Sequence, residues 1–323
     1  MSFRIATAPR RIALGVGLLL LVASCARASA NEEPIRIGVN LWVGYDLLEV
    51  AEDRGIFAAH GVDIEIVDFT SLSDVVSAYG RGQIDGMATS INEVLQVRSE
   101  GLRSPEIVLM TDYSAGADVI VAAPGIESLT DLAGRRVLVE PPLGSFILAL
   151  ALRTVGLSLE DVELVLVNQV EMPSVIAAGG ADAAVGYPPV SIEIERDAGF
   201  TQIFTTAEVS GEVVDVVSLD ASIVARHPEG VDALRMAWDD AIALLETDPQ
   251  PTIQAMADRE AIPVGEMEAL LNEVELLDWA HQASQFEEGS VDLLCLHAAE
   301  LMADLGLITD PTAAFGCASR DPR

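Results

Sequence analysis

The chain has 323 residues, half of them apolar, which is enough to bury the core of two modest domains or of one two-lobed protein. Its formal charge is −33, from 18 basic and 51 acidic residues, and every basic residue is an arginine. Such a negative field repels phosphates and argues against nucleic acid as a partner, and the lack of lysine excludes a Walker phosphate loop.

The N-terminal segment has the composition of an export signal. Arginines precede a run of 12 apolar residues, 12–23, which is too short to span a bilayer comfortably. The sequence VASC at 22–25 resembles a lipobox, so that Cys25 would be acylated and anchor the mature chain to a membrane. An ordinary signal-peptidase cut after ASA at 28–30 is the alternative. Either cut predicts an exported protein of the periplasm or cell envelope.

From residue 34 onward, strand and helix patterns alternate in two similar units. Period-2 and apolar runs predict strands, and 3.6-period runs predict helices. In the first unit the predicted strands are 35–42, 62–69, 84–90 and 106–114, and the predicted helices are 47–55, 73–82 and 92–101. In the second unit the strands are 135–142, 162–170 and 181–189, and the helices are 144–156 and 172–180.

The two units repeat one design at a nearly constant offset. Arg36 corresponds to Arg136, 100 residues later, and Asp85 corresponds to Asp182, 97 residues later. Such alternation predicts an α/β protein with two Rossmann-like lobes, each with a mostly parallel sheet covered by helices on both faces.

The C-terminal part is predicted to be helical. Amphipathic stretches occupy 227–246, 251–260, 264–280 and 290–306, and the tail beyond has little pattern. Cys295 and Cys317 would pair and pin this tail in an oxidising compartment, or they are two unrelated thiols; the sequence leaves both possibilities open.

Signatures of catalysis and of metal binding are missing. No nucleophile elbow occurs, and no pair of carboxylates is singled out by its spacing. Cys295 and His297 lie two residues apart and would face different sides of a helix, so they do not predict a metal site. The chain is therefore expected to be neither an enzyme nor a metal or cofactor carrier.

The turns that follow the predicted strands carry aromatic and polar residues together. Ligands of parallel α/β sheets bind at these carboxyl ends, and a few polar groups among aromatic rings are typical of small-molecule sites. Asp215 is added from the family resemblance described in the next paragraph, which implies that it lies at the return crossing from the second lobe. The predicted ligand-binding residues are Trp42, Tyr45, Asp46, Ser90, Glu93, Asp112, Ser114, Gly144, Ser145, Tyr187 and Asp215.

The order and spacing of these segments resemble a known family. The stretch from NLWVGYDLLEV to INEVL, at 40–95, then DYSAGADVIVAAPGIESLTDLAGRRVLVEPPLGS at 112–145 and VGYPPV at 185–190, are similar to solute-binding proteins of ABC transporters. The resemblance is to the nitrate/sulfonate/taurine and thiamine-pyrimidine precursor type. It implies a type II periplasmic-binding fold whose two lobes close on a ligand and then dock on a membrane permease.

The resemblance also implies the limits of the parts. We expect a lipoprotein-type signal peptide at 1–24, a tether at 25–33, lobe one at 34–117 and 219–323, and lobe two at 118–218. Two connecting segments between the lobes, near 114–121 and 214–219, would act as the hinge. A monomer is expected.

The ligand class is predicted from charge. An enzymatic branch of the family uses a pyridoxal-phosphate-linked lysine, which this chain cannot supply. The predicted cleft turns contain no arginine but several acids, which favours a neutral or cationic nitrogen-containing molecule, such as a pyrimidine-like heterocycle or an amine. A sulfonate, taurine or nitrate, received by the helix start at Gly144 and Ser145, is the alternative ligand. An extracytoplasmic sensor module is the alternative role.

Overall fold

The structure is a computed structural model that describes residues 33–319. The predicted signal peptide at 1–24, most of the tether and Cys25 lie outside these described residues. From Pro34 onward the chain forms one compact unit that contains two β-sheets. Within the described residues, no helix is both long enough and apolar enough to cross a membrane.

The first sheet has six strands and mixes parallel with antiparallel pairs. In spatial order they are β11 (Val274–Leu276), β4 (Pro105–Ser114), β10 (Val214–Asp220), β3 (Gly86–Ser90), β1 (Ile35–Val39) and β2 (Ile64–Asp68). β1 is parallel to both β2 and β3, whereas β10 runs antiparallel to β3 and β4. Every residue of β3 and of β10 is buried, as expected for central strands covered on both faces.

The second sheet has five strands and the same kind of order. They are β7 (Glu163–Leu166), β6 (Arg136–Val139), β8 (Ala183–Gly186), β5 (Val119–Ala122) and β9 (Thr201–Thr205). β6 is parallel to β7 and β8, and β5 runs antiparallel to β8 and β9. Each sheet therefore joins a parallel part to strands of opposite direction.

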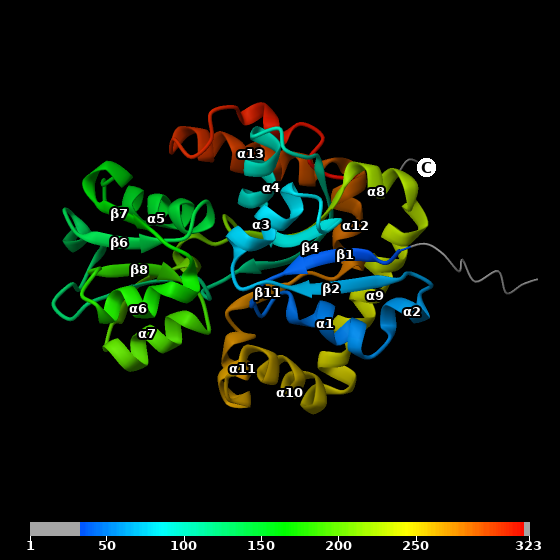
Figure 1. The fold of residues 1–323 in the computed structure, drawn as a ribbon, viewed down its shortest axis with the longest axis horizontal. Helices are drawn as coiled ribbons and strands as arrows, with labels where there is room; N and C mark the ends of the chain where they lie inside the picture. The colour runs from blue at the N-terminus through cyan, green and yellow to red at the C-terminus, as the bar shows by residue number, and fades with distance from the viewer. Residues whose placement is uncertain (1–32, 320–323) are drawn as a thin grey trace, which may run out of the picture. The chain divides into compact units, whose positions relative to one another are not determined.

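Helices cover both faces of each sheet (Figure 1). In the first sheet α3 and α4 lie on one face and α1 and α10 on the other; in the second, α5 lies opposite α6 and α7. Helices of the first-sheet region are α1 (Asp46–Asp53), α2 (Ile56–Ala59), α3 (Leu72–Gly80), α4 (Ile91–Ser99), α8 (Ala221–Arg226), α9 (Pro228–Thr247), α10 (Pro249–Glu260), α11 (Val264–Leu270), α12 (Trp279–Glu288) and α13 (Ser290–Asp304). Those around the second sheet are α5 (Leu143–Thr154), α6 (Met172–Ala177) and α7 (Val190–Ala198). Short 3₁₀ turns are η1 (Leu129–Leu132), η2 (Leu159–Asp161), η3 (Gln169–Glu171), η4 (Thr206–Val209) and η5 (Pro311–Ala314).

The repeat read from the sequence has a physical counterpart in the two sheets. The main-chain N–H of Arg36, at the start of β1, donates to Asp85 Oδ2 at 3.0 Å, and that of Arg136, at the start of β6, donates to Asp182 Oδ2 at 2.9 Å. Each aspartate thus joins its own strand to the neighbouring strand by the same contact.

The predicted helix over 264–280 is wrong in its middle. α11 ends at Leu270, and Val274–Leu276 forms the edge strand β11, because these residues pair with Ser114–Asp112 of β4. The unpaired edge of β4 offers main-chain partners that outweigh the helical propensity of the segment.

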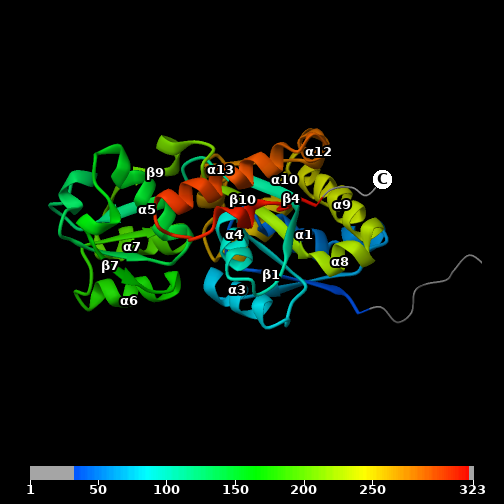
Figure 2. The same cartoon turned by 90° about the horizontal axis from the view of Figure 1, so that it is seen from above.

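The C-terminal tail is fixed although its sequence has little pattern. Cys295 on α13 and Cys317 form a disulfide. The guanidinium of Arg98 donates to the carbonyls of Ala313 and Phe315, at 2.7 and 2.6 Å. Since Arg98 ends α4, the tail and α13 are held against that helix (Figure 2).

Candidate functional site

The chain crosses between the sheets twice, and the crossings are tied together. Ser114 Oγ and Thr206 Oγ1 are 2.7 Å apart, and the Thr206 main-chain N–H donates to the carbonyl of Asp118 at 3.0 Å. The Asp118 N–H donates to Ser114 Oγ at 3.2 Å. These bonds place Asp118, the last residue before β5, at the junction between the sheets.

Strand direction explains why polar residues converge there. β1, β3 and β4 end at one edge of the first sheet, and the antiparallel β10 begins at that edge, so Asp215 lies opposite both Ser90 and Asp112. In the second sheet β6 and β8 end where the antiparallel β5 begins, with Val119 opposite Gly186. Ligands bind at the carboxyl ends of parallel strands, and antiparallel strands begin at the same place. Residues that precede antiparallel strands therefore also lie at the site.

Two adjoining cavities lie at this junction and share a wall of four residues: Leu72, Asp118, Leu143 and Tyr187. The first encloses at most about 240 Å³ and is completed by Glu140, Gly144, Ile147, Gln169, Val185 and Gly186. The second encloses at most about 200 Å³ and is completed by Asn40, Trp42, Tyr45 and Asp215. These figures include space that is open to solvent. The centre of a water-sized sphere has only about 10 Å³ in each cavity, room for about one water molecule, so a larger ligand needs a wider separation of the two halves.

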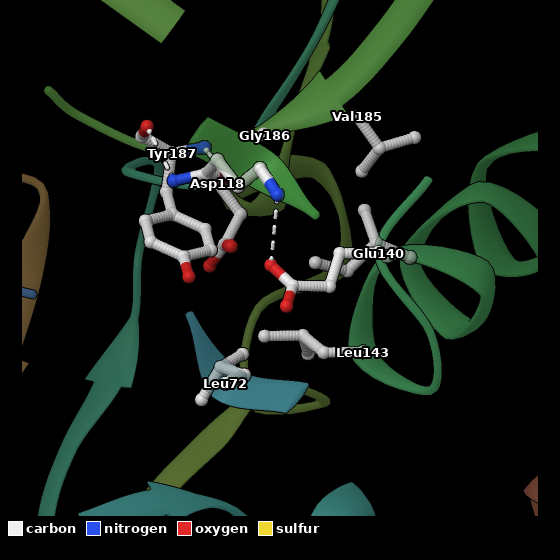
Figure 3. A pocket seen from close by; sticks show the side chains of 10 residues that line it. Leu72, Asp118, Glu140, Leu143, Val185, Gly186 and Tyr187 are labelled. Carbon is white, nitrogen blue, oxygen red and sulfur yellow. Dashed lines mark hydrogen bonds between the residues drawn. The ribbon is translucent and has the colours of Figure 1, made fainter. Parts of the chain in front are cut away.

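The first cavity is lined mainly by the second-sheet half of the molecule. Figure 3 shows the carboxylates of Asp118 and Glu140 and the ring of Tyr187 on one side, with Leu72 and Leu143 on the other. Glu140 Oε2 accepts from the Gln169 main-chain N–H at 3.1 Å. Its Oε1 accepts from the Ser73 main-chain N–H at 3.1 Å, which links the two halves.

The second cavity is aromatic. The rings of Trp42 and Tyr187 meet edge to face, with centroids 5.5 Å apart and planes at 86°. Asn40 Nδ2 donates to Tyr187 Oη at 3.1 Å, and Tyr45 Oη donates to Asp215 Oδ1. Contacts of Asn40 and Trp42 with Tyr187 therefore also join residues of the two halves.

Gly44, between the two aromatics, is required by close packing. A Cβ on Gly44 would lie 1.8 Å from Asp112 Oδ2, the oxygen that accepts from Trp42 Nε1 at 3.3 Å. Glycine therefore lets the turn between β1 and α1 approach this carboxylate, and the turn places Trp42 and Tyr45 in the wall of the cavity.

Five buried carboxylates surround the cavities, and we call them the cavity carboxylates: Glu93, Asp112, Asp118, Glu140 and Asp215. No arginine or histidine is among the residues that line either cavity in the described part of the chain. Burial raises the pKa of Glu93, Asp112 and Asp118 to about 7 in each case. Burial, followed by the charge of Asp112, raises the pKa of Asp215 well above its ordinary value. The cluster thus retains protons near neutral pH.

Several acceptors in this region have no hydrogen-bond partner within the protein. Asn40 Oδ1 and Asp118 Oδ2 belong to cavity-lining residues, and Glu93 Oε1 and Asp112 Oδ1 lie behind them. Buried acceptors without partners are costly, so the two oxygens of the cavity-lining residues, Asn40 Oδ1 and Asp118 Oδ2, are available to a donor from a ligand.

Glu93 stabilises the start of α5 from the opposite half. α5 has no side-chain cap of its own at Pro142. After burial, which raises the pKa of Glu93, the effects that lower it include the hydroxyl of Ser90, 2.5 Å from Oε2, and the main-chain N–H of Leu143. A carboxylate of the chain itself therefore faces the positive end of this helix.

The structure brings some of the predicted residues into the cavity walls and others behind them. Trp42, Tyr45, Gly144, Tyr187 and Asp215 line the cavities. The predicted residues Ser90, Glu93, Asp112, Ser114 and Ser145 are buried but line neither cavity. Sequence reasoning did not select Asn40, Leu72, Asp118, Glu140, Leu143 or Gln169, among others that line the walls. Asp118 precedes a strand instead of following one, so its place at the site depends on the antiparallel direction of β5, which the sequence does not show.

Asp46 lies elsewhere. Its Oδ1 is 2.6 Å from Arg259 Nη1, and it lines neither cavity. The same guanidinium contacts Glu49 at 2.5 Å and Asp68 at 2.9 Å, with Glu260 at 3.7 Å. Burial raises the pKa of Asp46 to about 7, and Arg259, an arginine from α10 that is remote in sequence, opposes this rise.

The described residues include no group of three or more His, Cys, Asp or Glu side chains arranged to hold a metal ion.

A known protein family matches this chain: the family model described as "NMT1/THI5 like" matches residues 47–252, more than half of the chain. The chain belongs to the NMT1/THI5-like family.

Relatives of this NMT1/THI5-like chain are remote in sequence. The "Putative binding protein" of Brucella abortus is 23% identical over 308 residues, covering 94% of this chain and 95% of the relative. The "Putative thiamine biosynthesis protein" of Haemophilus influenzae is 24% identical over 249 residues, covering 74% and 76%. The alkanesulfonate-binding protein SsuA of Xanthomonas axonopodis pv. citri, solved with MOPS bound, superposes with a TM-score of 0.76 at 17% identity, covering 90% of this chain and all of that one. This last likeness confirms the expected periplasmic-binding fold.

Proposed function

We propose that the protein is the exported solute-binding component of an ABC importer and that it captures a small nitrogen-containing molecule, pyrimidine-like or an amine. The observation that carries the ligand class is the cavity wall: it holds buried carboxylates and three aromatic side chains and, among residues 33–319, no arginine or histidine. Aromatic faces and carboxylates attract cationic or N–H-rich groups. Family membership and the fold support the binding role.

In this proposal the halves around the two sheets are lobes that close on the ligand. The expected limits were 34–117 with 219–323 for lobe one and 118–218 for lobe two. Because β10 (Val214–Asp220) lies in the first sheet, residues 214–218 join lobe one, so lobe one would be 34–117 with 214–323 and lobe two 118–213. The hinge was expected near 114–121 and 214–219. Since the second of these lies within β10, the crossing segments 115–118 and 206–213 would act as the hinge, and the Asn40–Tyr187 and Ser73–Glu140 bonds would form on closure. The closed form would then deliver the ligand to a membrane permease.

The alternative is a sulfonate, taurine or nitrate carrier, which the similar sulfonate-binding structure favours. The start of α5 at Gly144 is the place for such an anion. The carboxyl group of Glu93 already faces this helix start, and Glu140 lines the same cavity, so an added anion would compete with an acid of the chain itself for the helix N-terminus. The charge of the site therefore supports the nitrogen compound over the anion.

Calorimetry and small-angle scattering with a matched panel test this function. Amines and aminopyrimidines should bind and reduce the radius of gyration, whereas taurine, alkanesulfonates and nitrate should not bind. Tight binding of taurine or nitrate, with no binding of any nitrogen base, would refute the proposed ligand class. Chemical turnover of a bound compound, followed by NMR, would instead refute a pure binding role.

Export and lipid anchoring form a separate part of the proposal, supported by the lipobox-like sequence that ends at Cys25. Expressed from its complete gene in a bacterial host, the wild type should fractionate with membranes. Cys25→Ser should appear in the soluble envelope fraction, and Cys317→Ser serves as a cysteine control. Membrane retention of the Cys25→Ser protein would contradict acylation at this residue.

A further inference from the structure

Two oxygens of the residues that line the aromatic cavity, Asn40 Oδ1 and Asp118 Oδ2, indicate that the ligand nitrogen carries hydrogen-bond donors. Building on the proposed function, we propose that the ligand is a cation whose charged nitrogen carries N–H groups, such as an ammonium or an amidinium. Asp118 is the carboxylate that binds this nitrogen, and binding releases a proton from the cavity carboxylates.

The position of Asp118 supports this role. It is 2% exposed and lines both cavities, and its Oδ2 has no hydrogen-bond partner among the described residues. Its main-chain N–H and C=O are fixed by Ser114 and Thr206 at the crossing, so the residue is held in place without use of this oxygen. Figure 3 shows its carboxylate beside the Tyr187 ring, directed into the cavity.

A second acceptor lies in the same wall. Asn40 donates through Nδ2 to the hydroxyl of Tyr187 and to the carbonyl of Leu41, which orients its amide and leaves Oδ1 buried without a partner. Two unpartnered acceptors in one cavity require at least two donors from the ligand. A quaternary ammonium has no N–H and would leave both oxygens unsatisfied, whereas a primary ammonium or an amidinium has enough donors.

The charges around Asp118 explain the exchange of a proton. Six further acidic groups face the cavities or act on the groups that line them. They are Asp112 and Asp215 of the first sheet, Glu140 and Tyr187 after strands of the second sheet, Tyr45 before α1 and Glu93 of α4. All are acidic, so the cluster cannot carry its full negative charge in a buried site and retains protons. A bound cation supplies the missing positive charge, so one retained proton leaves to solvent while the ligand keeps its own.

The pH dependence of binding follows from this exchange. Below about pH 7 the cation competes with a bound proton, so affinity should rise about tenfold per pH unit as pH increases and level off above that value. A neutral ligand would show a flat profile or the opposite slope.

The test uses defined probes. Benzylamine, benzamidine, agmatine and 4-aminopyridine are compared with benzyltrimethylammonium and benzyl alcohol by calorimetry at pH 6, 7 and 8. Each titration is repeated in two buffers of different ionisation enthalpy. We expect at least one N–H cation to bind, with about one proton released at pH 6 and with at least thirtyfold preference over the quaternary and alcohol analogues. Binding without proton release, equal binding of benzyltrimethylammonium, or no binding by any N–H cation overturns the inference.

Variants separate Asp118 from its neighbours. Asp118→Asn should weaken the bound cation at least thirtyfold at pH 8, while the exposed Asp53→Asn should bind as the wild type does. Thermal unfolding of both variants checks that they fold, and the proton count on wild type stays decisive if Asp118→Asn does not. Wild-type affinity in a folded Asp118→Asn protein overturns the role of this residue. Binding of a neutral aminopyrimidine without proton release would refute only this inference, whereas binding of taurine alone would refute the proposed function as well.

Discussion

Two buried acidic clusters in this protein differ in what balances their charge. Around Arg259, the carboxylates of Asp46, Glu49 and Asp68 lie within 2.5–2.9 Å of one guanidinium, which is itself mostly buried. Around the cavities, the carboxylates accept from hydroxyls, amides and the Trp42 indole, and the part of the chain that the structure describes puts no arginine or histidine into the walls. Both regions contain several carboxylates, but only the first also contains an arginine that contacts them.

The difference separates a structural role from a binding role. Arg259 on α10 ties the start of α1 and the end of β2 together, and burial of these charges is stabilised by their mutual contact. Burial raises carboxyl pKa values in both clusters: to about 7 for Asp46 and about 9 for Glu260 beside Arg259, and to about 7 for Glu93, Asp112 and Asp118 at the cavities. Only beside Arg259 does an arginine oppose this rise. An acidic cluster that lacks its counter-charge within the fold is a candidate for a ligand that brings one.

The largest expected effect is loss of the compensating cation in the first cluster. Arg259→Met leaves Asp46 and Glu260 buried without an ion pair, so the free energy of unfolding should fall by about 3–5 kcal/mol in urea titrations. The control is Arg54→Met, which breaks the partly exposed pair with Asp248 and should cost at most about 1 kcal/mol. Equal effects of the two variants would remove the distinction between the clusters.

The second prediction concerns pH in the unliganded protein. The pKa of Asp112 is about 7 when folded, above its ordinary value of 3.8, so the folded state binds more protons than the unfolded state between these values. This group therefore contributes less stability as pH rises through that window. Asp112→Asn should raise the free energy of unfolding by about 1–3 kcal/mol at pH 8 and change it little at pH 4, with Asp53→Asn as the control. If Asp112→Asn instead lowers the free energy of unfolding at pH 8, the charge of Asp112 is balanced within the protein, which contradicts the proposed lack of a cationic partner.

A smaller effect is expected from the indole that faces Asp112. Trp42→Phe keeps a ring in the cavity wall but removes the donor to Asp112 Oδ2, so stability should fall by about 1–2 kcal/mol at pH 8, where the carboxylate is charged, and by less at pH 5. Denaturant unfolding at the two values measures this difference. A loss that is independent of pH would indicate packing alone.

The smallest effect is expected at the rim of the Arg259 cluster. Glu49 is more exposed than Asp46, with 23% against 0% of the side chain accessible. Glu49→Gln should therefore change the free energy of unfolding by less than about 1 kcal/mol, whereas Asp46→Asn should cost more. If Glu49→Gln lowers the free energy of unfolding more than Asp46→Asn does, then Arg259–Glu49, and not Arg259–Asp46, is the central ion pair of the cluster.

Much of the fold follows from local pattern. The strand before Asn40, the strand at Gly86–Ser90 and the helix from Leu143 have periods and boundaries that can be read directly, and the structure places them within a few residues. The repeat seen at Asp85 and Asp182 reflects one contact made twice. The edge strand at Val274–Leu276 was missed because its pairing with β4 is not local.

The candidate site was predictable only in part. Trp42, Tyr45 and Tyr187 follow strands that end at the site, so the rule for parallel sheets selected them. Asp118 precedes β5, and its direction is set by pairing with β8 and β9. Asp46 was selected because it adjoins Tyr45, but a helix that follows more than 200 residues later supplies the arginine that binds it.

The sequence by itself determined the two α/β units, the acidity and the absence of lysine, because periodicity and composition are local properties of the chain. The tertiary structure decided which buried acids are paired with arginine and which face the cavities. That choice depends on strand direction and on contacts between residues far apart in the chain, and these exist only after the sheets and helices have packed.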